Sequence, residues 1–257
     1  MKKIFINSLI AATLLIAAAG CKKEINYKAD RTFLDTKNAL LKINFGSAYA
    51  LNPSVQLSIN AERVSGLITG RTPFPGGGYN TNGSNFPDYL ALKAGSNILK
   101  ISIPKKLTNV DSVVLFTGNL ILEAGKNYTA HVTDTLANTK MVVLQDNMDF
   151  ANLGYSKYRF VNMMPNVPFV DLYYGTVKVA DAIPYLGNSP YFYIAVPATA
   201  LTWSIRETGT LPTSTALATY ISSNTHITQR VYTAFAMGYK GSVATTTKPY
   251  VSFFLTR

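Results

Sequence analysis

Residues 128–133 read Tyr128-Thr129-Ala130-His131-Val132-Thr133, and this short stretch decides the fold class. Apolar and polar side chains alternate along it, which is the two-residue period of a β-strand with one face on a core. The two threonines and the histidine are expected to face water. The same opening returns 104 positions later as Tyr232-Thr233-Ala234. We therefore expect a chain that is built from strands and contains a duplication.

Other segments support the duplication. The stretch Tyr89–Ala94 resembles Tyr193–Ala198, again with an offset of 104, whereas Val55 and Val170 are 115 positions apart. The first copy therefore holds 11 additional residues, which fall in the Gly- and Pro-rich stretch 73–83. A repeat this long exceeds the 20–50 residues of solenoid repeats, so each copy is expected to be a domain with its own core.

The composition favours an all-β chain. Charged residues make up only 14% of the sequence, while Tyr, Phe, Thr, Val and Ile are frequent, as in pleated and half-buried surfaces. We count about seven short strand candidates per copy, separated by turn clusters such as residues 123–127 and 187–190. Seven short antiparallel strands in about 100 residues favour a Greek-key β-sandwich. The predicted segments are a signal peptide at 1–20, a tether at 21–39, and β-sandwich domains at 40–148 and 149–257.

The repeated motifs resemble one known family. Strands Phe160-Val161-Asn162 and Val170-Asp171-Leu172-Tyr173, followed by Tyr193-Ile194-Ala195-Val196-Pro197, are similar to the domain of unknown function family 4397. The second copy carries these motifs more clearly, and the first copy is diverged, with Gln56 where the second has Asp171. The resemblance implies two tandem immunoglobulin-like β-sandwiches in a bacterial envelope lipoprotein, and it brings no catalytic residues.

The N-terminus indicates export. Two lysines, an apolar run and small residues form a secretory signal peptide. Its last residues, Ala18-Ala19-Gly20-Cys21, resemble a bacterial lipobox, which implies cleavage before Cys21 and acylation of that residue with a diacylglyceryl group and a further fatty acid such as palmitate. Lys22 in place of the Asp that retains lipoproteins at the inner membrane favours the outer membrane by analogy, facing either side. The alternative is an uncleaved transmembrane helix from Ile4 to Gly20, near the lower length limit for a span.

The formal net charge of +11 does not indicate nucleic-acid binding. The basic residues are dispersed, and beyond the signal peptide only Lys22-Lys23 and Lys105-Lys106 are adjacent. An exported protein rarely meets nucleic acid. The charge suits a solvated surface facing a polyanionic envelope, or serves solubility alone.

No catalytic or metal-binding residue is predicted. His131 and His226 lie in different copies, and we expect both to be exposed to solvent. Asp146 and Asp149 would suit a calcium loop, but residues 145–154 are better interpreted as a linker. The sequence contains no Gly-x-Ser-x-Gly elbow and no phosphate-binding loop. A carboxylate pair assembled across strands stays open, and no cofactor is expected.

The inserted loop is the predicted ligand-binding segment. Phe74, Tyr79 and Phe86 lie among flexible residues, and aromatic side chains on adaptable loops suit recognition of a glycan or a protein. The alternative is that such rings close the ends of the sandwiches. The sequence thus predicts a lipid-anchored, non-enzymatic binding or adhesion module of the cell envelope. A structural accessory subunit of an outer-membrane complex is the alternative, and a hydrolase is the third possibility.

Overall fold

The computed structural model describes residues 37–69, 77–81 and 87–257. Cys21 and the signal peptide lie outside these residues, so the prediction of a lipid anchor stays a prediction. Among the described residues, no helix is long and apolar enough to span a membrane.

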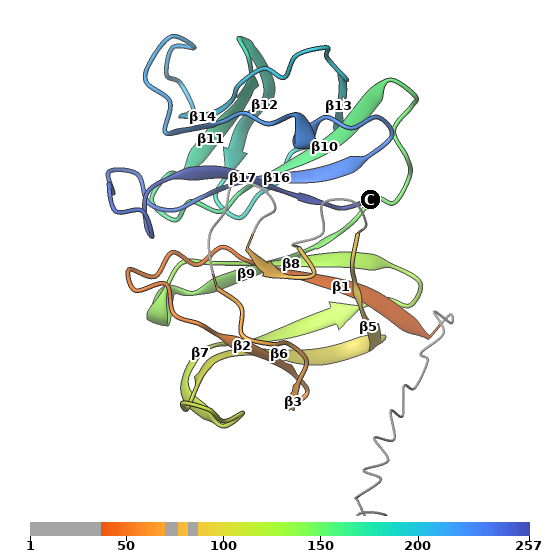
Figure 1. Cartoon of the computed structure of the whole chain (residues 1–257), viewed down its shortest axis with the longest axis vertical. Coiled ribbons are helices and arrows are strands. Elements are labelled where there is room, and N and C mark those ends of the chain that lie inside the picture. Colours follow the sequence, from red (N-terminus) through yellow and green to blue (C-terminus); the bar gives the residue numbers. More distant parts are fainter. Residues whose placement is uncertain (1–36, 70–76, 82–86) are drawn as a thin grey trace, which may run out of the picture. The chain divides into compact units, whose positions relative to one another are not determined.

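The predicted all-β class is confirmed (Figure 1). The only helices in the described part of the chain are two 3-10 turns, Leu136–Asn138 and Ser223–Thr225. The strands of the first copy are β1 (Asn38–Phe45), β2 (Gln56–Ile59), β3 (Glu62–Arg63), β4 (Gly78–Tyr79), β5 (Leu90–Lys93), β6 (Gly95–Pro104), β7 (Asp111–Leu122), β8 (Asn127–Thr133) and β9 (Lys140–Gln145). Those of the second copy are β10 (Tyr155–Asn162), β11 (Phe169–Tyr174), β12 (Val177–Pro184), β13 (Phe192–Ala195), β14 (Trp203–Glu207), β15 (Ala218–Tyr220), β16 (Val231–Met237) and β17 (Tyr250–Leu255).

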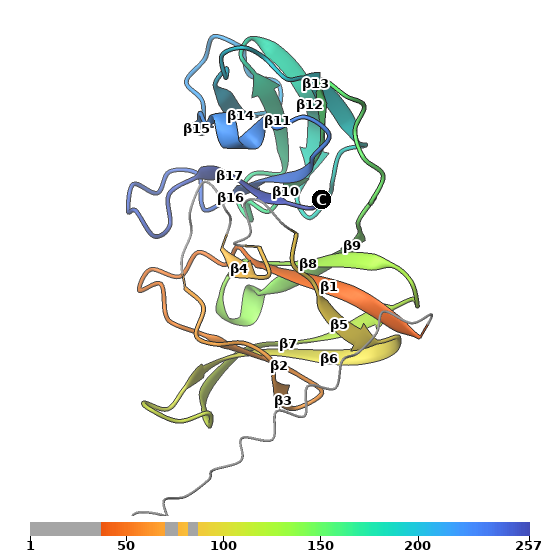
Figure 2. The ribbon, with the colours of Figure 1, turned by 45° about the vertical axis from the view of Figure 1, so that its right-hand side comes forward.

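Each copy is a sandwich of two sheets around its own apolar core (Figure 2). In the first copy, the sheet β4-β1-β8-β9, with β5 also on β1, packs against the sheet β3-β2-β6-β7. In the second copy, the sheet β13-β10-β16-β17 packs against β12-β11-β14-β15, and Trp203 is fully buried between them. Each sandwich also contains one parallel strand pair, β1 with β8 and β10 with β16, among otherwise antiparallel pairs.

The strand registers repeat with the offset read from the sequence. Leu57 lies opposite Ile101 in the first copy, and Leu172 lies opposite Ile205 in the second, 104 positions after Ile101. The parallel pairs agree, since β8 and β16 occupy the same place beside β1 and β10.

One proposed equivalence is shifted. Leu40 pairs with Asn127 and with Ala91, while Lys157 pairs with Val231, 104 positions after Asn127, and with Tyr193. The counterpart of Tyr193 is therefore Ala91 rather than Tyr89. A slip of two residues keeps the same side chains on the same face, so the alternating pattern does not reveal it.

The polar faces of β1 and β8 are buried, which corrects the expectation that they face water. Thr129, His131 and Thr133 are at most 1% exposed. These faces contact the β10–β16–β17 sheet of the second copy: Thr133 Oγ1 donates a 2.6 Å hydrogen bond to the Met163 carbonyl, and Lys42 Nζ donates one of 2.6 Å to the Leu255 carbonyl. The alternation along β1 and β8 therefore reflects two buried faces. The apolar face packs in the core of the first copy, and the polar face contacts the second copy.

A third apolar cluster completes this contact between the copies. It contains Val161, Met163, Phe235, Met237 and Phe254, against which Leu144 packs from the first copy. By its internal contacts, Leu34–Arg257 forms one compact unit that includes both copies.

Candidate binding surface

The loops at one end of the first sandwich form the candidate site. β1 and β8 run parallel and end there, β6 ends and β7 begins there, and β2 begins beside the end of β6. The connections 46–55, 105–110 and 134–139 therefore gather at this end, which we call the apical end. Residue 37 precedes β1 and lies at the opposite end of the sheet.

The apical end carries the most exposed large apolar side chains among the described residues. Leu107 is 96% exposed, and Leu51 and Val243 are each 93% exposed. Val243 belongs to the β16–β17 loop of the second copy. Hydrogen bonds join this loop to the apical end of the first copy. Thr246 Oγ1 donates a 2.8 Å hydrogen bond to the Ala50 carbonyl, and the Tyr239 hydroxyl donates one of 2.8 Å to Asp134.

Two apical leucines have an unfavourable backbone conformation. Leu107 has φ of 59° and Leu136 has φ of 55°, in the left-handed region that a side chain with a Cβ atom disfavours by roughly 1–2 kcal/mol. Both side chains are largely exposed, so burial in the chain itself does not offset this cost. Strained residues of this kind gather at functional sites.

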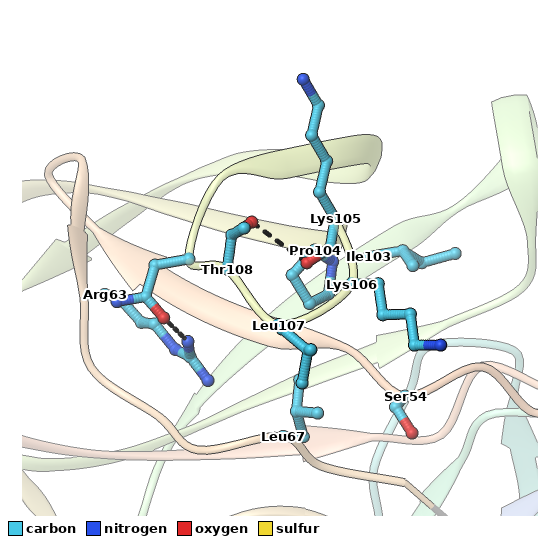
Figure 3. Close-up of a pocket in the computed structure, with 10 residues that line it drawn as sticks. Ser54, Arg63, Leu67, Ile103, Pro104, Lys105, Lys106, Leu107 and Thr108 are labelled. Atoms are coloured by element: carbon cyan, nitrogen blue, oxygen red, sulfur yellow. Dashed lines mark hydrogen bonds between the residues drawn. The ribbon is translucent and has the colours of Figure 1, made fainter.

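The first of two hollows lies against the β6–β7 turn (Figure 3). Its volume is about 540 Å³. Figure 3 shows Lys105 pointing away from the side of the turn on which Leu107 lies. The residues that line it are Ser54, Arg63, Leu67, Ile103, Pro104, Lys105, Lys106, Leu107, Thr108 and Asn109. Three of these side chains are cationic and none is a carboxylate.

The second hollow, also of about 540 Å³, lies beside the first and shares Ile103 with it. Leu51, Val113 and Leu136 line it from the first copy, and Tyr239 and Thr247 line it from the β16–β17 loop. Its walls are thus mainly aliphatic. Together the two hollows and the exposed leucines form one surface with apolar projections and a cationic border.

Carboxylates near this surface are held by internal partners. Asp111 accepts hydrogen bonds from Lys100, Ser102 and Gln56, and these bonds, led by that of Lys100, lower its pKa to about 2. Asp134 accepts a hydrogen bond from the Tyr239 hydroxyl and one of 2.8 Å from the Thr135 amide. Both carboxylates therefore contribute to the shape of the loops.

The residues predicted to bind ligand lie partly outside the described chain. Phe74, Phe86 and the lipidation site Cys21 are among the residues that the structure does not describe. Tyr79 lies in β4, opposite Ile43 of β1, and packs against the first core. Its half-buried ring packs as expected for a ring that closes the end of a sandwich. A binding role for the 73–86 loop stays a prediction.

Both histidines are buried, so the expectation that they face solvent is wrong. His131 is 0% exposed and His226 is 5% exposed. His131 lies between the two copies, where Asn44 Nδ2 is 3.1 Å from its Nδ1. Burial, together with the nearby Arg159 guanidinium, lowers the pKa of His131 well below its usual value. The sequence signal was misleading because the polar face of β8 contacts the other sandwich.

Asp146 is a structural residue between the copies. It forms an ion pair with Arg159, and both side chains are almost completely buried. Its second oxygen accepts a 2.7 Å hydrogen bond from Thr129 Oγ1 and one of 3.1 Å from the Tyr89 hydroxyl. These partners leave Asp146 unsuited to a calcium loop, and the described residues contain no group of three or more potential metal ligands.

The sequence pattern alone does not distinguish Leu51, Leu107 or Val243 as binding residues. Each is an apolar residue in a connection rich in polar and turn-forming residues, as in Lys105-Lys106-Leu107-Thr108-Asn109. An apolar residue within a polar connection was the sequence signal that could have indicated a binding residue. It does not reveal that three connections far apart in the sequence meet at one end of the fold.

The comparison with family models gives one match. The family described as "Domain of unknown function (DUF4397)" matches residues 42–173. The matched range begins in β1 and ends in β11, so it covers the first copy and the opening strands of the second. It lies mainly in the copy whose motifs looked more diverged. No curated protein matches the sequence.

The similar solved structures differ widely from this chain. A leucine-rich repeat protein from Bacteroides thetaiotaomicron is 13% identical with a TM-score of 0.20; the match covers 72% of this chain and 24% of that one. CBMbc (family CBM26) from Eubacterium rectale Amy13K, in complex with maltoheptaose, is 10% identical with a TM-score of 0.23 and coverages of 85% and 97%. The fimbrial anchor protein Mfa2 from Porphyromonas gingivalis is 9% identical with a TM-score of 0.22 and the same coverages. Scores this low carry no conclusion about function.

Proposed function

The chain belongs to the DUF4397 family, and we propose that it is a non-enzymatic binding or adhesion protein of the bacterial cell envelope. In this proposal a lipid on Cys21 holds it to the outer membrane, and the apical end binds a protein ligand. Neither a cofactor nor nucleic acid takes part.

The observation that carries the proposal is the exposure of Leu51, Leu107 and Val243 at one end of the fold. Burying a large aliphatic side chain in an interface contributes roughly 1.5–3 kcal/mol, before the costs of association. Three such side chains around two hollows therefore supply the apolar centre of an interface. The backbone strain at Leu107 supports this, since strained residues gather at functional sites.

The chemistry of the surface favours a protein over a glycan. Its projections are aliphatic, and Arg63, Lys105 and Lys106 form a cationic border beside the first hollow. An apolar centre with charged residues at the rim is typical of protein–protein interfaces. The expected ligand presents apolar pockets bordered by acidic side chains.

A pair of double variants tests the apical end. The first is Leu51→Ser with Leu107→Ser, and the matched control is Leu153→Ser with Val177→Ser, which removes two exposed apolar side chains elsewhere (77% and 63% exposed). The full chain is produced on bacterial cells, and their attachment is measured to immobilised envelope proteins and to a glycan array. We expect the apical variant to attach to envelope proteins at least tenfold more weakly than wild type, and the control to be unchanged.

Other outcomes of this experiment reject the proposal. Equal attachment by the two double variants excludes the apical end. If wild type attaches to glycans alone and the apical variant loses this attachment, the ligand is a sugar and not a protein. Isolation of one stoichiometric envelope complex, with no attachment to either array, favours the accessory-subunit alternative. Turnover of a glycan that a single carboxylate substitution abolishes favours a hydrolase.

The lipid anchor has its own test. Cells are grown with a palmitate analogue that carries an alkyne, and labelling and membrane retention are compared between wild type and Cys21→Ala. We expect the variant to lose both the label and its retention in the membrane, because Cys21 carries all the acyl chains of the predicted anchor. Several acyl chains are needed for durable anchoring. A labelled variant, or one that stays equally firmly in the membrane fraction, contradicts the anchor.

A further inference from the structure

The longest strand of the structure lies at a sheet edge. β7 spans twelve residues, Asp111–Leu122, and pairs with β6 on one side. In the described part of the chain, no strand pairs with its other side. A free edge presents unpaired N–H and C=O groups, which are a template for another strand.

The second half of this edge lacks the usual protection against pairing. Proteins protect free edges with short strands, charged side chains, prolines or bulges. Residues 112–122 of β7 contain no charged residue and no proline, and Ile121 is 72% exposed. The corresponding edge of the second copy is β15, which has three residues. The other edge strand of that sheet, β12, contains Lys178, Asp181 and Pro184.

The second half of β7 is also regular. Both irregularities in its pairing with β6 lie in the first half, before Phe116. From Phe116 to Leu122, seven consecutive residues face Ile101 to Gly95 without interruption. A regular segment of this length is sufficient for a complete strand pair.

We propose that this edge binds the same edge of a second copy of the chain. The two segments Phe116–Leu122 run antiparallel around a two-fold axis at Asn119, and the two four-stranded sheets become one sheet of eight strands. An interface with two-fold symmetry must be self-complementary. The segment Phe116–Leu122 contains no charged residue and satisfies this condition, because no like charges face each other across the axis, as they would along a strand rich in lysine.

The alternation of side chains agrees with this register. Thr117, Asn119 and Ile121 point away from the core, and Leu120 and Leu122 point into it. In the paired segments Asn119 faces Asn119 of the other copy, and Thr117 faces Ile121. The antiparallel arrangement also places residue 37 of the two copies at opposite ends of the joined sheet.

Cysteine cross-linking of the full chain tests the register. Asn119→Cys should give a disulfide-linked dimer on mild oxidation, because residues facing each other across antiparallel strands lie about 4.5–5.5 Å apart at Cα. Thr117→Cys alone should not, since the two copies of this residue would be roughly 13 Å apart, beyond the reach of a disulfide. Co-expression of Thr117→Cys with Ile121→Cys should restore the cross-link. The matched control is Thr219→Cys, an exposed residue at the centre of β15.

A charge variant gives an independent readout. Asn119→Lys places two ammonium groups opposite each other on the axis, so light scattering in detergent should show a monomer where wild type is a dimer. Thr219→Lys should remain dimeric, and circular dichroism should show both variants folded. The proposal is overturned by equal cross-linking at positions 117, 119 and 219, by a monomeric wild type, or by polydisperse aggregation. The Leu51→Ser, Leu107→Ser variant should still dimerise, so this inference and the apical site fail separately.

Discussion

His226 lies in a chain of hydrogen bonds that fixes its protonation state. Trp203 Nε1 donates to His226 Nε2 over 3.1 Å, and the Tyr158 hydroxyl, which donates to the Thr225 carbonyl, lies 2.9 Å from His226 Nδ1. Nδ1 therefore carries the proton and donates to Tyr158, while Nε2 accepts from Trp203. A second proton on Nε2 would point at the Trp203 N–H group, so two donors would face each other and the hydrogen bond would be lost. Burial lowers the pKa of His226 to about 4.

This low pKa makes stability depend on pH. Below about pH 6.5 the unfolded chain takes up a proton at His226 that the folded chain does not accept until about pH 4, so stability falls as the pH decreases through this range. Between about pH 6.5 and pH 5 the loss at this site should be on the order of 1–2 kcal/mol. Urea unfolding at several pH values measures it. His226→Gln should flatten the dependence in part, since His131 contributes in the same direction; equal slopes for variant and wild type would contradict the assignment.

Leu107 should show a conflict between stability and binding. Asn tolerates positive φ better than Leu, so Leu107→Asn should raise the free energy of unfolding by about 0.5–1 kcal/mol while weakening attachment. Leu51→Asn is the control, since Leu51 is equally exposed and is not among the described residues with positive φ. Thermal unfolding should distinguish the two. A stability gain shared by both variants would show that polarity rather than strain is responsible.

At the scale of single elements, the sequence predicted the strands well, but it did not predict what their polar faces contact. The alternation along β8 correctly gave a strand with one apolar face, but the opposite face is buried against the second sandwich. Threonine, lysine and histidine can line such a contact because the other sheet supplies hydrogen-bond partners, as the Leu255 carbonyl does for Lys42. A pattern of polar residues does not distinguish solvent from a polar protein surface. The same holds for Asp146, which lies in the linker predicted at residues 145–154.

β4 depends on a single glycine. Gly78 has φ of 132°, and a Cβ atom there would lie 2.1 Å from the Ile43 carbonyl oxygen. Gly78→Ala should therefore release β4 from β1, at a cost of about 1–3 kcal/mol. Hydrogen exchange should show faster exchange in residues 77–80. Gly66→Ala is the control, because nothing lies within 4 Å of its added Cβ and its effect should stay within about 0.5 kcal/mol. Unchanged protection at residues 77–80 would show that β4 adapts to the side chain.

At the scale of the whole molecule, the polar and apolar contacts between the copies join their stabilities. Burial lowers the pKa of Lys42 to about 8 against the opposing effect of Asp146 and Asp88, so this contact accommodates a lysine at a cost. The sequence predicted the two sandwiches from their internal repeat. It did not predict this contact, nor the apical site, because both depend on loops and faces that meet only after folding.

We expect one cooperative unfolding transition. Trp203 is the only tryptophan and lies in the second core, so its fluorescence reports on that copy, whereas circular dichroism reports on both. Their midpoints should coincide in wild type. Asp146→Ala leaves Arg159 buried without its partner, which should cost about 3–5 kcal/mol and separate the midpoints.

The control for this prediction is Asp181→Ala. The ion pair of Asp181 with Lys178 is largely exposed, and its loss should cost no more than about 1 kcal/mol with coincident midpoints. Separate midpoints already in wild type would show that the copies unfold independently.

The parallel pairing of β1 with β8 has a mechanical consequence. A pull between an anchor before residue 37 and a ligand that holds Leu136 in the β8–β9 loop draws β1 backward along its own axis while β8 is drawn forward. The force is then directed along the strands, across the rungs from Leu40–Asn127 to Phe45–Val132, and all six carry the load together. Such shear resists rupture far better than peeling, in which bonds break one after another. The same strand that joins the tether to the sandwich thus acts as a clamp under tension.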